Sequence, residues 1–400
     1  MKTLSLAWSY LWSRPLGAAL NLLLLSLGLA SMTFLLLVSS QLSKAFERDL
    51  QGIDVVVGAK GSPMQLILSG VFHIDVPPGN VPLKAVQELQ KHPMVAQVIP
   101  ISLGDSLRGF RIVGSSHDYI SHYQARLAQG QLWTQPMQVV LGAAVARKSG
   151  LGMGGTFVGT HGLGEGGHVH GDSFYTVVGV LAPSGSVLDQ LILTDTASVW
   201  KVHEDYTAVD DEDRQVMIEE REVTMALITY KSPLAAVSFP RFINTSTEMQ
   251  AAAPALEITR LLSMLGLGTD VLRAFAGVLL LTAGLSVFIA LWSAVRERRG
   301  DLALLRMLGA PPAKVAALLL LEALWLGALA AVLGVLAGQG MAAGLAWLLQ
   351  LDNALLMGGM AWPTELWVVP AVALGVSLVA AVLPALAAYR VTVLELLQGK

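Results

Sequence analysis

Four long runs of apolar residues dominate the pattern of the chain. A helix that crosses a bilayer needs about 20 mainly apolar residues, and each run reaches that length without a charge, apart from Glu322 near the start of the third. Buried helices of a soluble protein seldom lack charge on every face over such a length. We therefore predict four transmembrane helices, with cores at about residues 16–38, 274–295, 315–338 and 366–389.

The first apolar run is expected to remain in the mature protein. The apolar region of a cleaved signal peptide is about 7–15 residues long and ends at a small-x-small cleavage site. This run is longer, and it continues into Ser39, Ser40 and Gln41 without such a site. It therefore predicts a retained helix.

A long segment with the pattern of a soluble protein separates the first two spans. Within it, Ile53–Val57 and Val223–Tyr230 are rich in β-branched residues and predict strands. Leu83–Lys91 and Ala143–Gly150 predict helices, the second ending at its glycine. The expected fold is a membrane protein of four transmembrane α-helices, with an α+β extracytoplasmic domain inserted between spans 1 and 2.

The two ends of this segment differ from its middle. Gln41–Leu50 and Thr247–Leu267 carry apolar residues at helical spacing, so we expect them to extend the neighbouring spans as a stalk. The chain then divides into an amphipathic N-terminal helix with span 1, the extracytoplasmic domain with its stalk ends, and spans 2 to 4. These parts cover residues 1–42, 43–268 and 269–400.

Composition narrows the functional classes. Hydrophobic residues make up 54% of the 400 residues and charged residues 14%, against about 25% charged in soluble proteins. So apolar a chain is not disordered, and its net charge of -3 gives no reason to expect a nucleic-acid partner. It has no cysteine, which excludes disulfides, thiolate metal sites and cysteine nucleophiles.

Basic residues in the short flanks predict the orientation, because cytoplasmic loops are enriched in Lys and Arg. The loop between spans 3 and 4 has neither. Both termini and the loop at 296–314 are therefore expected in the cytoplasm, and the inserted domain outside it. The basic residues that carry this prediction are Lys2, Arg14, Arg296, Arg298, Arg299, Arg306, Lys314, Arg390 and Lys400.

The 296–314 loop is the most specific segment of the chain. It has a charged start, apolar residues at helical spacing (Leu302, Leu305 and Leu308), the stop signal Gly309 and a proline pair. An amphipathic helix on a membrane face is suited to docking into a groove of a partner. A basic loop that only anchors the chain to the membrane is the alternative.

Several segments resemble the MacB/FtsX-like family of ABC-transporter permeases. Asp301-Leu-Ala-Leu-Leu-Arg-Met-Leu-Gly-Ala310 is similar to the family's cytoplasmic loop, and Leu321-Glu-Ala-Leu324 to the start of its third span. The end, Pro384 to Leu397, resembles the family's closing motif and departs from it at Val393, where proline is common. Trp8–Pro15 fits the amphipathic helix before span 1, and Phe46–Leu50 is similar to the LolC/LolE branch.

The resemblance implies a bacterial inner-membrane subunit that is not itself an enzyme. The family's permeases pair with a second permease copy or paralogue and with a cytoplasmic ABC ATPase dimer. That ATPase is expected on a separate chain, because this one has no G-x-x-x-x-G-K-[ST] phosphate loop. Motion driven by ATP would pass through the spans to the outer domain, a mode of action called mechanotransmission.

The resemblance leaves the work done outside the membrane open. One expectation is export or extraction of a hydrophobic or amphipathic substrate or a lipoprotein, with membrane lipids and a periplasmic or lipoprotein partner as neighbours. The alternative is a signalling subunit that activates a periplasmic partner such as a cell-wall hydrolase. The residues expected to couple the chain to its ATPase are Arg299, Leu302, Leu305, Arg306, Leu308 and Gly309.

Two further features suggest chemistry. His161, His168, His170 and Asp172 lie in a glycine-rich stretch, and imidazole with carboxylate suits Zn²⁺. A metal-linked transport or sensing role is one interpretation, and a solvated flexible loop is the other. Glu322 is costly inside a membrane. Close to the cytoplasmic end of its span, it is within reach of the membrane interface or Lys314, and we expect a structural or coupling role rather than one in proton or substrate transport.

Overall fold

The computed structural model describes residues 3–13, 15–160, 169–207, 215–218, 220–348 and 363–390. The chain divides into two compact units. The membrane unit comprises residues 1–42 and 264–400, and the inserted domain comprises residues 43–263.

The membrane unit contains the expected transmembrane helices. Within the described residues, four helices are long and apolar enough to cross a membrane, which confirms the prediction. Proline starts three of the long helices (Pro15, Pro254 and Pro312), at a position where its missing N–H costs nothing. The helices are α1 (Thr3–Leu11), α2 (Pro15–Leu50), α10 (Pro254–Glu297), α11 (Arg299–Met307), α12 (Pro312–Leu348), η2 (Thr364–Trp367) and α14 (Val368–Tyr389).

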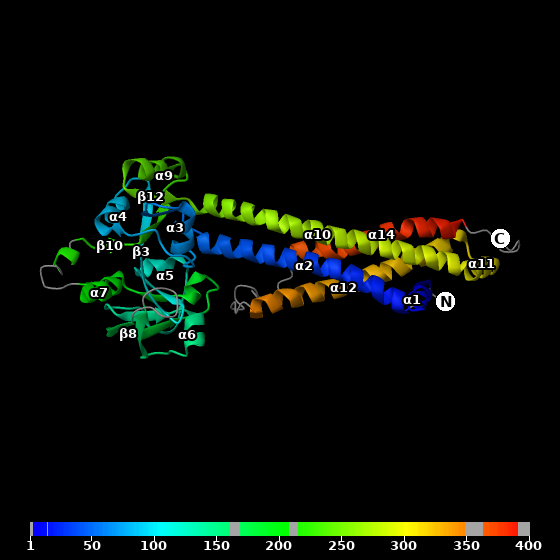
Figure 1. Ribbon diagram of the computed structural model, residues 1–400, viewed down its shortest axis with the longest axis horizontal. Coiled ribbons are helices and arrows are strands. Elements are labelled where there is room, and N and C mark those ends of the chain that lie inside the picture. The colour runs from blue at the N-terminus through cyan, green and yellow to red at the C-terminus, as the bar shows by residue number, and fades with distance from the viewer. Residues whose placement is uncertain are drawn as a thin grey trace. The chain divides into compact units, whose positions relative to one another are not determined.

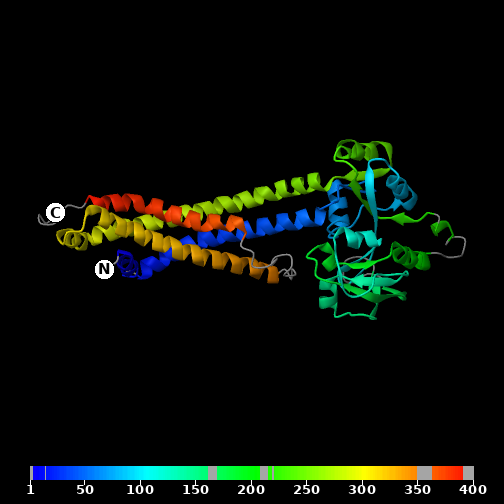
Figure 2. The same ribbon diagram turned by 180° about the vertical axis from the view of Figure 1, so that it is seen from behind.

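Small residues let the spans of the membrane unit pack closely, and Figures 1 and 2 show α12 running beside α14. A Cβ added to Gly327 of α12 would lie 2.6 Å from the Ser377 hydroxyl oxygen of α14. A Cβ added to Gly334 would lie 2.6 Å from the Leu29 Cβ of α2. Glycine is therefore required where α12 meets both neighbours, as is usual for close contacts between membrane helices.

The inserted domain is built on one mixed sheet with helices packed against it (Figure 1). The strand order is β12-β1-β11-β3-β4-β9-β6-β8-β5, and β7 pairs with β3 and β8. Most neighbours are antiparallel, while β4 with β9 and β6 with β8 are parallel. The strands are β1 (Val55–Ala59), β3 (Val95–Leu107), β4 (Phe110–Ser115), β5 (Leu127–Gly130), β6 (Gln138–Leu141), β7 (Thr156–Thr160), β8 (Val169–Leu181), β9 (Ile192–Thr194), β11 (Met225–Tyr230) and β12 (Met249–Ala252).

Short helices and a small second sheet complete the inserted domain. The second sheet pairs β2 (Val81–Pro82) with β10 (Glu222–Val223). The predicted helix that ends at Gly150 is present as α6, and Gly150 has a φ of 72°, in the left-handed region that favours glycine. The helices are α3 (Pro63–Gly70), α4 (Leu83–Gln90), α5 (His117–His122), α6 (Ala143–Ser149), η1 (Val187–Gln190), α7 (Thr196–Thr207) and α9 (Ala235–Ser246).

One expected helical extension is partly wrong. The spacing predicts a helix from Thr247 into span 2, but Met249–Ala252 form strand β12, which pairs with β1, and α10 begins only at Pro254. Proline disfavours a helical conformation in the residue before it, so the helix does not continue back through Ala253. The other extension is confirmed, because α2 remains helical to Leu50.

Candidate functional site

The apolar residues of α11 point in two directions. Leu302 and Ala303 are 4% and 2% exposed, and Leu302 belongs to the buried core of the membrane unit. Leu304, Met307 and Leu308 are exposed, and Leu308 has an exposed fraction of 83%. We call these last three residues the α11 apolar face. Of the sequence-predicted coupling leucines, the structure therefore places Leu308 on this face, Leu305 in a half-buried position and Leu302 inside the unit.

The C-terminal end of α11 is a tight glycine turn. Gly309 has a φ of 93°, which side-chain-bearing residues rarely adopt. The Leu308 N–H donates to the Leu304 carbonyl oxygen and the Ala310 N–H to the Leu305 carbonyl oxygen, so the last carbonyls of the helix are satisfied. Arg306 lies in the last turn, where a positive charge suits the helix dipole. The side chain of Arg299, another predicted coupling residue, lies outside the described part.

A buried charged centre adjoins the start of α11. Arg298 Nη1 lies 3.7 Å from Glu322 Oε2, and the exposed fractions of the two side chains are 14% and 10%. Arg298 Nη2 also donates to the Tyr10 carbonyl oxygen at 3.0 Å and to the Ser13 hydroxyl oxygen. The Arg298 guanidinium carbon lies 4.7 Å from the centre of the Tyr10 ring. We call Arg298 and these three partners the arginine joint.

Glu322 has its described contact within the arginine joint. The sequence suggested the membrane interface or Lys314, and the described contact is with Arg298, which belongs to the junction of α10 and α11. A cavity of about 220 Å³ lies beside the joint and is lined by residues such as Gly17, Asn21 and Ala294. Reasoning from sequence missed this arrangement, although a carboxylate in an apolar run indicates a nearby cation.

An apolar groove lies between three of the spans. It has a volume of about 310 Å³ and is lined by Met32, Leu35 and Leu36 of α2, Ala276, Gly277 and Leu280 of α10, and Val372 of α14. Arg273 also lines it and is paired with Asp270 at 3.0 Å. An apolar groove lined in part by a charged residue suits an amphipathic ligand that has an apolar tail and a polar head.

Both stalk helices are firmly joined to the inserted domain. Helix α2 is followed by β1 and helix α10 is preceded by β12, and these two strands are hydrogen-bonded neighbours. Phe46 of α2 and Ile258 of α10 contribute to one hydrophobic core. The last turn of α2 is also fixed by Asp49, whose carboxylate accepts from the Val187 N–H and whose carbonyl oxygen accepts from the Tyr123 hydroxyl.

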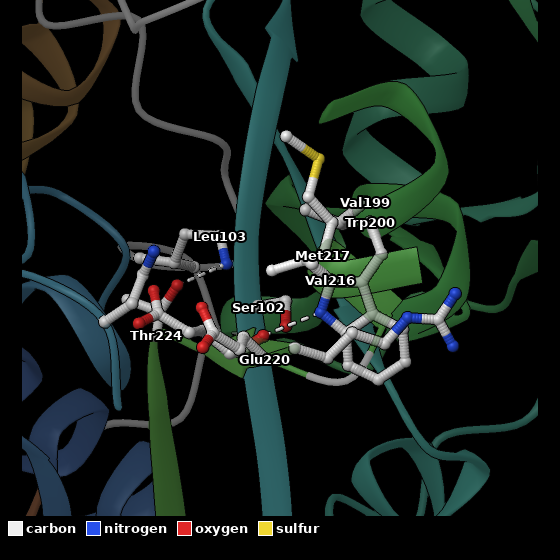
Figure 3. Close-up of a pocket in the computed structure, with 11 residues that line it drawn as sticks. Ser102, Leu103, Val199, Trp200, Val216, Met217, Glu220 and Thr224 are labelled. Atoms are coloured by element: carbon white, nitrogen blue, oxygen red, sulfur yellow. Dashed lines mark hydrogen bonds between the residues drawn. The ribbon is translucent and has the colours of Figure 1, made fainter. Parts of the chain in front are cut away.

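The inserted domain also contains a cavity of about 380 Å³ beside α7 (Figure 3). Trp200 and Val199 of α7 line it together with Met217, Glu220 and other residues that precede β11. The Trp200 indole N–H donates to the Glu222 carbonyl oxygen at 2.6 Å, and the Thr224 hydroxyl accepts from the Leu103 N–H at 3.0 Å.

Both apolar and polar side chains line this cavity. The Arg221 guanidinium carbon lies 4.8 Å from the Trp200 ring centre. The Ser102 hydroxyl is buried without a hydrogen-bond partner among the described residues. Such a lining suits contact with an amphipathic molecule.

One histidine of the inserted domain is buried and contacts a buried tyrosine. His73 is 7% exposed, and its Nε2 lies 2.9 Å from the Tyr119 hydroxyl oxygen, which is also buried. Burial, and to a smaller extent the charge of Arg111, lower the pKa of His73 from 6.5 to about 3. With so low a pKa, His73 is a weak base at physiological pH, far from the matched pKa that general-base catalysis favours.

The predicted metal site falls mostly outside the described part of the chain. His161 and His168 lie there, and so do the side chains of His170 and Asp172, although the backbone of the latter two belongs to β8. Among the described residues, no group of three or more His, Cys, Asp or Glu side chains is arranged to hold a metal ion.

Two family descriptions match the sequence. The FtsX-like permease C-terminal description matches residues 273–393, and the MacB-like periplasmic core domain description matches residues 18–233. No curated protein matches the chain significantly. The family assignment rests on these two sequence matches.

Two solved structures show a distant likeness. The periplasmic region of MacB from Actinobacillus actinomycetemcomitans is 13% identical with a TM-score of 0.35, and the match covers 54% of this chain and 95% of that one. The extracellular domain of the noncanonic ABC-type transporter YknZ from Gram-positive bacteria is 11% identical with a TM-score of 0.31, and that match covers 49% and 98%.

Proposed function

The chain belongs to the MacB/FtsX-like family of ABC-transporter permeases, and we propose that it transmits the motion of a separate ATPase to its inserted domain. The observation that carries this proposal is the continuity of the stalk. Helix α10 has 44 residues, which corresponds to a rod of about 66 Å at 1.5 Å per residue. It connects β12 to the segment that leads into α11. Helix α2 has 36 residues and leads into β1.

Each stalk helix adjoins a strand of the inserted domain, and this connection supports the transmission of force. Because β1 and β12 are hydrogen-bonded to each other, a displacement of either stalk helix acts on the same edge of the sheet. The shared hydrophobic core around Phe46 and Ile258 supports the same conclusion. Motion of the stalk would therefore move the inserted domain as a body rather than unfold its edge.

The α11 apolar face is the proposed ATPase contact. Its residues Leu304, Met307 and Leu308 leave apolar area exposed on a short helix, and an amphipathic helix that enters a groove binds through such a face. Leu302 supports this helix from the inside. The proposed contact therefore keeps Leu308, Gly309 and Arg306 from the sequence prediction and adds Leu304 and Met307. The positive charge of the loop favours its location, with both chain termini, in the cytoplasm.

The proposed cargo is a hydrophobic or amphipathic molecule, for instance a lipoprotein. The apolar groove, which Arg273 lines in part, supports this choice, because an acyl chain would contact its apolar residues and a polar head would suit the Arg273–Asp270 pair. The mixed lining of the cavity beside Trp200 suits the same kind of molecule outside the membrane. We further propose that a second permease copy or paralogue completes the transporter in the bacterial inner membrane.

Replacing one leucine tests the ATPase contact. Leu308→Asp puts a charge on the α11 apolar face, while Leu234→Asp makes the same change at a leucine of the inserted domain that is equally exposed, at 83%. Each tagged variant is purified from host membranes in mild detergent, and its partners are identified by mass spectrometry and by ATP hydrolysis.

We expect the amount of ATPase that copurifies with Leu308→Asp to fall at least 10-fold. One charge buried in the interface lowers the binding free energy by more than about 1.4 kcal/mol. Leu234→Asp should retain the ATPase. If Leu308→Asp retains the ATPase and its activity in full, the proposed contact is wrong.

A further inference from the structure

The two stalk helices receive motion from α11 by different routes. Helix α10 ends at Glu297, and only Arg298 separates it from α11, so a displacement of α11 reaches span 2 through the backbone. Helix α2 has no such link. It begins at Pro15 and is preceded by α1, which ends at Leu11. Within the described part of the membrane unit, motion of α11 reaches α1 and α2 through contacts between helices rather than along the backbone.

The arginine joint supplies such a contact. Arg298 lies at the N-terminal boundary of α11 and bonds to the Tyr10 carbonyl oxygen and the Ser13 hydroxyl, at the C-terminal end of α1. It is also paired with Glu322 of α12. One guanidinium group therefore joins three segments that are distant in sequence. Figures 1 and 2 show α1 and α11 at the same end of the membrane unit.

The chemistry of the joint suits transmission of force. A guanidinium group is planar and has five N–H donors, so it can hold several partners in fixed directions. The Tyr10 ring lies against it, and the low exposure of Arg298 and Glu322 reduces screening by water and salt. The adjacent cavity of about 220 Å³ leaves space into which the joined segments can shift together.

We propose that Arg298 is a positioning residue that makes α1, and with it α2, move together with α11. This inference rests on the proposed function, in which the ATPase acts on α11. Both stalk helices would then be displaced in the same stroke, which keeps the hydrogen-bonded pair of β1 and β12 in register. Without the joint, α1 would lose its polar link to the start of α11, and α2 would follow the stroke only through its packing on the neighbouring spans and the Ser286–Asn21 hydrogen bond.

Distances between α1 and α11 test the proposal, and the cysteine-free sequence allows labels at chosen sites only. Spin labels are attached to Leu4→Cys in α1 and Asp301→Cys in α11, both of which are exposed. The distance between them is measured in the full complex with its ATPase, first without nucleotide and then after ATP hydrolysis in the presence of vanadate, which traps ADP in the ATPase. The variants are Arg298→Gln and the double variant Arg298→Gln with Glu322→Gln, in which no charge is left unpaired.

In the parent complex we expect the distance between the labels to be the same in both states. In both joint variants we expect it to shift or broaden on trapping. Arg296→Gln removes the same charge from an exposed side chain two residues earlier and should behave as the parent. The purified variants should keep the bound ATPase, which a loss of folding would not allow.

Two outcomes would overturn these ideas separately. If the distance in both joint variants stays as constant as in the parent, α1 is coupled to α11 by other contacts and the inference about Arg298 is wrong. If Leu308→Asp retains the ATPase, the docking proposal fails, whatever the labels report.

Discussion

Replacing Gly338 with alanine tests a close contact between α2 and α12. A Cβ at this position would lie 2.5 Å from the Thr33 Cβ and 2.7 Å from the Ala30 carbonyl oxygen. Carbon atoms in favourable contact are about 3.5–4.0 Å apart, so the two helices would have to separate locally by about 1 Å. Gly340 lies in the same helix, and a Cβ there meets no atom within 4 Å, which makes Gly340→Ala a matched control.

The size of the effect follows from two opposed contributions. Inserting a methyl group into a packed contact costs about 1–3 kcal/mol. Alanine favours a helix over glycine by up to about 1 kcal/mol, and this gain is common to both variants. The difference between Gly338→Ala and Gly340→Ala therefore isolates the packing cost, and we expect the free energy of unfolding to differ by about 1–3 kcal/mol. For a unit of this size, that corresponds to roughly 2–12 °C in Tm.

A buried thiol can report unfolding of the membrane unit alone. The chain has no cysteine, and Ala381 of α14 is fully buried, so Ala381→Cys reacts with a fluorogenic maleimide only when this unit opens. Thermal ramps of both glycine variants in this background give the two Tm values. If Gly338→Ala is no less stable than Gly340→Ala, the close packing of α2 on α12 is refuted.

Two other predictions concern the inserted domain and the apolar groove. The pKa of His73 is about 3 in the folded protein and 6.5 as a free side chain. Between pH 6.5 and 3 only the unfolded state takes up a proton at His73. The free energy of unfolding is therefore unaffected above pH 6.5 and falls by about 1.4 kcal/mol per pH unit as the pH is lowered towards 3. Between pH 7 and 5 the free energy of unfolding of the parent, measured from urea midpoints, should fall by about 2 kcal/mol more than that of His73→Asn. Equal losses in the two proteins would contradict this pKa. In the groove, a Cβ on Gly277 meets no atom within 4 Å, so the ring of Gly277→Phe should fill the groove. The amount of amphiphile that copurifies with this variant, measured by native mass spectrometry, should therefore decrease. Gly375→Phe, at an equally open position outside the groove lining, should not reduce it.

Several features of the fold could be predicted because they depend on local sequence. The length of each apolar run decides whether it can cross a bilayer, and the described part of the chain contains the four expected helices. The stop at Gly150 was predictable for a similar reason, since the left-handed turn after a helix favours glycine. The family motif around Leu302–Ala310 is also contiguous, so the family could be recognised before any contact was known.

The candidate site was harder to predict. Helical spacing placed Leu302, Leu305 and Leu308 on one face of α11, but only the packing of the membrane unit buries Leu302 and leaves Leu304 and Met307 exposed. The proposed zinc site at His161, His168, His170 and Asp172 stays a prediction of the sequence, since its side chains lie outside the described part.

The sequence by itself determined which segments of this protein enter the membrane and which family it belongs to, because hydrophobic length and a contiguous motif are properties of neighbouring residues. The tertiary structure alone decided that Arg298 contacts Tyr10 and Glu322, and that Met249–Ala252 pairs with β1 as a strand. Such contacts join residues far apart in the chain. Their free energy depends on how close the helices and strands come and how much water they exclude, and no local pattern of residues encodes either quantity.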